Sequence, residues 1–133
     1  ESANIKLIKV YEEIIDGVTM SPSNRFYYYY NPNREYIFYN SSSRTLRQSD
    51  IMHLNVEQLI IARNEIFARN GYCFTDDELM DYFLQYSWYR PQAAPGRRDL
   101  ISLNSTERAN INLLLEYQDY LEELYDSYGY YGW

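Results

Sequence analysis

Residues 59–72 of this 133-residue chain form the pattern that most constrains its fold: an apolar helical stripe with a positive charge in its middle. Leu59, Ile66 and Phe67 recur at helical spacing and so share one face of the predicted helix. Arg63 falls inside the same face. An unpaired guanidinium in a protein interior costs on the order of several kcal/mol, so Arg63 needs an acidic partner or contact with solvent. The stretch therefore predicts a core helix whose surroundings must compensate a charge.

Two roles for Arg63 are open at this point. In the structural role, its guanidinium forms a buried ion pair with a carboxylate of the last helix. Glu107 is the leading candidate because it lies in the first turn of that helix, near the apolar edge. In the functional role, Arg63 reaches solvent and clamps an anion or a carboxylate. Core-facing arginines are normally paired, which favours the ion pair.

Three predicted helix starts share one capping chemistry, in which a cap side chain and the third helical residue satisfy each other's backbone N–H groups. The three pairs are Asn55 with Gln58, Thr75 with Glu78, and Asn104 with Glu107. Asn70 and Gly71 predict the end of the first helix, with Gly71 in the left-handed conformation. The second helix is expected over about residues 76–87 and the third over about residues 105–125.

The segments outside these helices are less regular. Residues 5–16 predict a short amphipathic helix that stops at Gly17. Residues 25–30 and 35–39 are aromatic runs on either side of an Asn-Pro-Asn-Arg turn, a pattern typical of a hairpin or of two extended segments. The tail over residues 126–133 has no period and is expected to be frayed or extended.

Together these patterns predict a mainly α fold. The expected architecture is a compact bundle of about three capped helices, with an N-terminal helix and an extended aromatic segment or small hairpin. The expected core residues are Leu59, Ile66, Phe67, Phe83, Leu114 and Tyr117.

Charge and composition exclude several kinds of partner. A net charge of −7 and a pI near 4.6 argue against nucleic acid, which requires a basic surface, and disfavour anionic membrane surfaces. No run approaches the ~18 apolar residues of a membrane-spanning helix, so we expect no membrane insertion by this segment. The single cysteine, Cys73, excludes an internal disulfide and a multi-cysteine metal site.

The sequence contains no recognisable catalytic or metal-binding pattern. The acidic residues between positions 76 and 81 lack the ligand spacing and the turn glycine of a calcium loop, and they suit the positive end of a helix. His53, the only histidine, has no serine or cysteine nucleophile turn beside it. We therefore expect no enzymatic activity, no metal and no cofactor.

Aromatic clusters are the best candidates for ligand binding, because amphipathic rings are favoured at binding surfaces and can stack on sugars or peptides. The candidates are Tyr27, Tyr28, Tyr29, Tyr30, Trp88 and Tyr89. Core packing is the stronger interpretation for Trp88 and Tyr89, which lie at a helix end. The four tyrosines place rings on both faces of a strand. Their exposure would favour binding, and burial of all four would favour a structural role.

One stretch resembles a known family. Residues 62–72 read Ala-Arg-Asn-Glu-Ile-Phe-Ala-Arg-Asn-Gly-Tyr, and an ordered series of further positions follows. That series is Phe74, Glu78, Leu79, Tyr82, Phe83, Trp88, Tyr89, Glu107, Arg108, Ala109, Asn110 and Ile111. In this order the residues resemble the YARHG domain, which is named after the motif that aligns with residues 67–71. The upstream residues 36–46 look like the lead-in to this domain.

The resemblance implies a domain over residues 36–118, an N-terminal extension over residues 1–35, and the end of the last helix with an aromatic tail over residues 119–133. Such domains are found on bacterial proteins that face the cell exterior, often beside membrane anchors or wall-associated modules. The chain departs from the motif at two positions, where Phe67 replaces the tyrosine and Asn70 replaces the histidine. Hydroxyl or imidazole chemistry at these positions is therefore excluded here.

These inferences lead to one expected function and one alternative. We expect a non-catalytic module on the extracellular side of the bacterial membrane that binds or positions cell-wall glycan or peptide, or an envelope protein. The alternative is a structural spacer beside a membrane anchor or an enzymatic neighbour.

Overall fold

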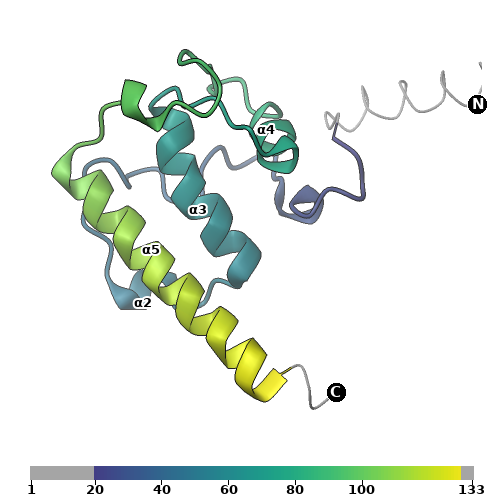
Figure 1. The fold of residues 1–133 in the computed structure, drawn as a ribbon, viewed down its shortest axis with the longest axis vertical. Helices are drawn as coiled ribbons and strands as arrows, with labels where there is room; N and C mark the ends of the chain where they lie inside the picture. Colours follow the sequence, from purple (N-terminus) through teal and green to yellow (C-terminus); the bar gives the residue numbers. More distant parts are fainter. Residues whose placement is uncertain (1–19, 130–133) are drawn as a thin grey trace, which may run out of the picture.

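Helix α3 spans Val56–Arg69 and lies at the centre of the domain (Figure 1). In the computed structural model, which describes residues 20–129, the predicted cap of α3 is confirmed: the side chains of Asn55 and Gln58 accept each other's backbone N–H groups. Gly71 follows the helix with φ +84°, as predicted. This left-handed conformation turns the chain away from the helix axis, and residues other than glycine rarely adopt it.

Helix α5 spans Ser105–Leu124 and runs antiparallel to α3 (Figure 1). Its cap is also the predicted one, with Asn104 and Glu107 satisfying each other's backbone N–H groups. Leu59 of α3 and Leu114 of α5 are fully buried in the same apolar cluster. The antiparallel packing places the end of α3 against the start of α5. It therefore determines which polar side chains of the two helices can bond to each other.

Helix α4 spans Asp77–Phe83 and is shorter than the predicted helix over residues 76–87. Its cap corrects the prediction, because the Asp76 carboxylate, and not Thr75, accepts two N–H groups of the first turn. The Glu78 side chain accepts a backbone N–H from a distant loop, so it does not complete a capping box with Thr75. A carboxylate one residue closer to the helix then takes the cap position.

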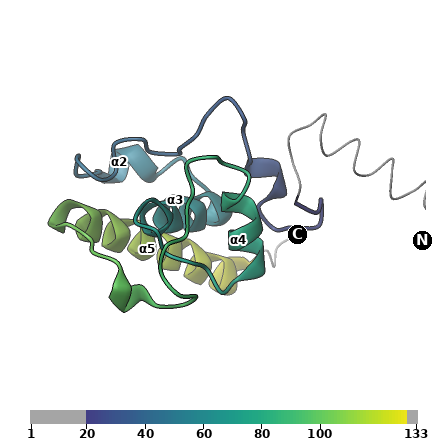
Figure 2. The same ribbon diagram turned by 90° about the horizontal axis from the view of Figure 1, so that it is seen from above.

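The remaining elements are short. They are the 3₁₀ turn η1 (Tyr27–Tyr29), helix α2 (Gln48–Ile51), the 3₁₀ turn η2 (Arg98–Leu100) and the π-helical turn η3 (Tyr125–Gly129). Figure 2 shows α3 between α2 and α5. Since η3 continues α5, the tail predicted to be frayed is helical as far as residue 129. The helix predicted over residues 5–16 lies outside the described residues.

The mainly α fold and most of the predicted core are confirmed. Leu59, Ile66, Phe67, Phe83 and Leu114 are buried. Tyr117 is half-buried, and its hydroxyl donates to the carbonyl of Met52. No helix between residues 20 and 129 is long and apolar enough to cross a membrane.

Of the two alternatives predicted for the aromatic runs, the hairpin is wrong, because residues 20–129 contain no strand. Residues 27–29 form a 3₁₀ turn instead of extended chain, and the side chain of Asn24 accepts the N–H of Phe26 just before it. Further along, the backbone N–H groups of Ile37 and Phe38 donate to a side chain of α3 and not to a partner strand. Side chains thus satisfy backbone groups that a sheet would otherwise pair.

A buried side chain of α5 holds residues 41–46, which we call the lead-in loop. Asn110 of α5 is fully buried, and its amide nitrogen donates to the carbonyls of Ser41 and Arg44. Its amide oxygen accepts the N–H of Leu46 at 2.8 Å. A buried asparagine that makes three bonds to one loop fixes the position of that loop against α5.

We predict that Asn110→Leu lowers the free energy of unfolding by about 3 kcal/mol or more, because three backbone groups of the lead-in loop lose their partners. Urea denaturation followed by circular dichroism measures the change. Asn112→Leu, at an exposed position of the same helix, is the matched control and should shift stability by less than about 0.5 kcal/mol. Equal small effects of both substitutions would show that water replaces the Asn110 bonds.

Candidate functional site

Arg69, near the end of α3, binds the segment that precedes the lead-in loop. Its Nη1 donates to the carbonyls of Phe38 at 3.2 Å and Tyr39 at 2.8 Å. Its guanidinium lies 4.4 Å from the ring centroid of Tyr36, in a cation–π contact. Arg69 therefore does more than complement the helix dipole. It attaches residues 36–39, which we call the aromatic segment, to the end of α3.

Asn70 and Glu107 join the end of α3 to the start of α5. The Asn70 amide donates to the Ile66 carbonyl at 2.8 Å and to Glu107 Oε2 at 2.9 Å. Glu107 also accepts the Ser42 hydroxyl at 2.8 Å and the N–H of Asn104 at 3.0 Å. One buried carboxylate thus connects α3, α5 and the lead-in loop.

The predicted ion pair between Arg63 and Glu107 is wrong. Arg63 lies near the middle of α3 and Glu107 at the start of α5, so the antiparallel register places them opposite different residues. Arg63 Nη2 donates to Gln118 Oε1 at 3.1 Å, and Glu107 faces Asn70 instead. The amphipathic pattern identified the correct helix faces, but it contains no information on the register between them.

A double-mutant cycle tests this correction. We expect a coupling free energy of at least about 1 kcal/mol between Asn70→Ala and Glu107→Ala, because the two side chains share a partly buried hydrogen bond to a carboxylate. The matched cycle of Arg63→Ala with Glu107→Ala should give a coupling within about 0.5 kcal/mol of zero. Equilibrium unfolding in urea measures both. A larger coupling for Arg63 would restore the original ion pair.

Glu65 is a buried carboxylate that the sequence analysis did not select. Its two oxygens accept the N–H groups of Ile37 at 2.8 Å and Phe38 at 3.1 Å. Burial raises the pKa of Glu65 to about 7, although these two bonds and the nearby Arg69 and Arg34 favour the ionised form. The sequence signal that could have identified Glu65 was its position as an acidic residue inside the predicted core helix, and α3 is indeed buried on nearly all sides.

The raised pKa predicts a pH dependence of stability. Folded Glu65 retains its proton up to about pH 7, whereas the unfolded chain releases it near pH 4.5. Its contribution is therefore fully present below pH 4.5 and is lost as the pH rises to about 7, by up to about 3 kcal/mol. Urea unfolding of the wild type and of Glu65→Gln between pH 4 and pH 8 should show the wild type losing stability relative to the variant. A relative gain with rising pH would mean that the bonds hold Glu65 ionised.

The four consecutive tyrosines meet neither condition set by the sequence. Tyr28 is largely exposed, with 83% of its surface accessible. Tyr27, Tyr29 and Tyr30 are half-buried and pack against the main apolar cluster. The run therefore contributes mainly to packing, with one ring directed to solvent.

Trp88 and Tyr89 separate into a surface ring and a core ring. Tyr89 is buried, and its hydroxyl donates to the Tyr72 carbonyl at 2.7 Å. Burial raises the pKa of Tyr89 to about 12. Trp88 is half-buried, and its indole N–H donates to the Glu35 carbonyl at 3.0 Å. Of the two, only Trp88 is placed to meet a ligand.

Trp88 belongs to a continuous set of ring contacts, which we call the aromatic row: Tyr30, Tyr86, Trp88 and Tyr36. Successive ring centroids lie 5.0, 6.0 and 4.9 Å apart. The row ends where Tyr36 contacts the Arg69 guanidinium. It therefore leads from the tyrosine run to the end of α3.

The pockets on the described surface include the three considered next. The first, of about 230 Å³, lies beside the aromatic row at the end of α3, and we call it the motif pocket. Arg69, Trp88 and Arg90 contribute its charged and aromatic side chains, while Asn70 and Gly71 belong to its wall. A second pocket of about 290 Å³ contains Arg63 and Arg98.

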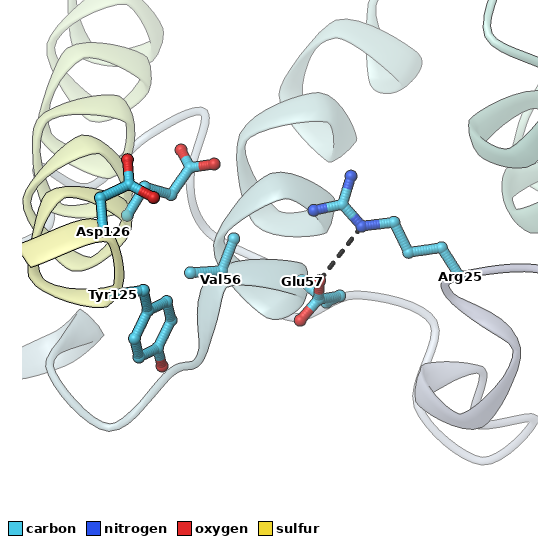
Figure 3. Close-up of a pocket in the computed structure, with 6 residues that line it drawn as sticks. Arg25, Val56, Glu57, Tyr125 and Asp126 are labelled. Atoms are coloured by element: carbon cyan, nitrogen blue, oxygen red, sulfur yellow. Dashed lines mark hydrogen bonds and ion pairs between the residues drawn. The ribbon is translucent and has the colours of Figure 1, made fainter. Parts of the chain in front are cut away.

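The third pocket, of about 320 Å³, lies between the start of α3 and the end of α5 (Figure 3). On one side Arg25 and Glu57 form an ion pair at 3.1 Å, and Asp126 and Tyr125 approach from the opposite side. Between residues 20 and 129, no group of three or more histidine, cysteine, aspartate or glutamate side chains is arranged to hold a metal ion. Because Glu57 pairs with Arg25, the charge of Arg25 is already compensated within the chain.

Comparison with known proteins identifies one family. The family model described as the YARHG domain matches residues 34–119. This range includes α3, the motif pocket, the lead-in loop and most of α5. No curated protein and no solved structure matches the chain.

Proposed function

Because the chain belongs to the YARHG domain family, we propose that it is a non-catalytic binding module of a bacterial envelope protein. In this proposal the module acts on the extracellular side of the membrane and holds the protein against cell-wall glycan. The observation that carries the proposal is the aromatic row that ends at the motif pocket.

The motif pocket combines two kinds of group that suit a sugar polymer. Trp88 supplies an amphipathic ring on which the apolar face of a sugar can stack. Arg69 and Arg90 supply guanidinium N–H groups for hydroxyl or carboxylate oxygens. Tyr36 supports both kinds of group, since its ring contacts Trp88 and the Arg69 guanidinium.

The polar residues of the motif support a role without catalysis. Arg69 and Asn70 bond to carbonyls and to a carboxylate of their own chain, and these bonds hold the fold together. Phe67 is buried and contributes packing. Neither Phe67 nor Asn70 offers the hydroxyl or imidazole of the family motif to a substrate.

A structural spacer is the second candidate, and one observation favours it. Tyr27, Tyr29 and Tyr30 are half-buried against the core, so most of the tyrosine run is used for internal packing. A domain whose loops are held by buried polar bonds would keep a neighbouring domain at a constant distance from a membrane anchor.

Binding to purified cell wall tests the proposal. We expect Tyr36→Ala and Arg90→Gln to weaken retention more than about five-fold, because Tyr36 supports Trp88 and Arg69, and Arg90 lines the motif pocket. The matched control is Tyr120→Ala, which removes an exposed ring on α5. Circular dichroism verifies that each variant is folded. Equal retention of all four proteins would overturn the assignment to the motif pocket, and failure of the wild type to bind would favour the spacer.

A further inference from the structure

The pocket that contains Arg63 and Arg98 is a second site with its own chemistry, which we call the arginine pocket. Arg63 reaches it from α3 and Arg98 from η2. Gln118 of α5 and the start of α4 complete its walls. It shares no lining residue with the motif pocket, so it stands independently of the function proposed above.

Arg63 is a half-buried cation whose charge the protein compensates poorly. Nη2 donates to the neutral side chain of Gln118, and the buried Nε has no acceptor. No ion pair between residues 20 and 129 includes Arg63. Asp119 and Glu122 favour its charge from a distance, but burial and the Arg98 charge lower the pKa of Arg63. Glu122 accepts a hydrogen bond from Gln118, which stands between it and Arg63.

Arg98 brings a second guanidinium to the same pocket. It lies 4.6 Å from the ring centroid of Phe67 and 5.6 Å from that of Tyr72. Stacking on rings restricts a guanidinium and directs its N–H edge along the ring plane. Arg98 also makes no ion pair with any described residue. Two cations without a carboxylate in contact, on a chain with a net charge of −7, are complementary to an anionic group.

The other walls of the pocket restrict which anion fits. Tyr72, Phe74, Ile60 and Leu79 add apolar surface to its lining. Asp76 lies at the pocket with a negative charge, which disfavours a multiply charged phosphate. Both cap bonds of Asp76 end on Oδ1, so Oδ2 is free to accept an N–H group. The pocket thus presents cations, apolar surface and an acceptor.

A peptide C-terminus has the matching groups: a carboxylate, a neighbouring side chain and an amide N–H. A sugar acid has the carboxylate, but it brings hydroxyl groups to the apolar surface. We propose that the arginine pocket binds the C-terminal carboxylate of a peptide that ends in a small apolar residue. Arg63 and Arg98 hold the carboxylate, the terminal side chain packs against Tyr72 and Phe74, and Asp76 accepts the amide N–H.

The test is a titration of the folded chain with N-acetyl-alanyl-alanine, followed by NMR chemical shifts and calorimetry. We expect saturable binding, with the largest shifts at Tyr72, Phe74 and Arg98. The C-terminal amide of the same peptide should bind at least about ten-fold more weakly, because it lacks the charge. Methyl glucuronide and inorganic phosphate should also bind at least about ten-fold more weakly than the peptide acid.

Two substitutions assign the binding to the arginines. Arg98→Gln, at an exposed position, should weaken binding of the peptide acid at least about ten-fold without unfolding the chain, and Arg63→Gln should do the same. Arg97→Gln is the matched control, since Arg97 precedes Arg98 and is already paired with Asp99 at 2.7 Å; it should leave binding unchanged. Equal binding of the acid and the amide, equal binding of glucuronide or phosphate, or full binding by Arg98→Gln would each overturn the proposal. None of these results depends on cell-wall retention.

Discussion

The structure depends on buried polar side chains of α3 and α5 that satisfy the backbone of a segment without regular structure. Glu65 accepts two N–H groups from the aromatic segment, and Asn110 makes three bonds to the lead-in loop. A buried backbone group without a partner costs about 1–3 kcal/mol, so this segment could not lie against the helices unaided. The apolar contacts between α3 and α5 bring the helices together, whereas these polar bonds determine where the loops lie.

In this arrangement the polar residues of the family motif have a structural role. Arg69 and Asn70 look like binding or catalytic residues, yet the structure uses them to join α3 to the aromatic segment and to α5. Their position also creates the motif pocket, because the Arg69 guanidinium that holds Tyr36 lies beside Trp88 and Arg90. A side chain needed for the fold thus also lines a pocket at the end of α3.

Local chemistry in the sequence predicted the helices well, and long-range pairing was missed for identifiable reasons. Asn55, Asn104 and Gly71 act within a few residues, so the boundaries of α3 and α5 followed from the sequence. The α4 cap was missed because a distant backbone N–H engages Glu78. The partner of Arg63 was missed because it depends on the antiparallel register of two helices. Of the residues that line the motif pocket, only Trp88 was predicted to bind a ligand, because the fold is what brings residues 68–71 beside residues 88–92.

The tyrosine-rich composition and the choice of cation form one physical feature. Both lysines stand at positions 6 and 9, so arginine supplies all the lysine-or-arginine charge between residues 20 and 129. Arginine keeps its charge when half-buried and stacks on aromatic faces, which lysine does less well. Arg69 lies over Tyr36, and Arg98 lies over Tyr72. The rings therefore serve as supports that hold guanidinium groups at both pockets, which explains how an acidic chain can present cationic sites.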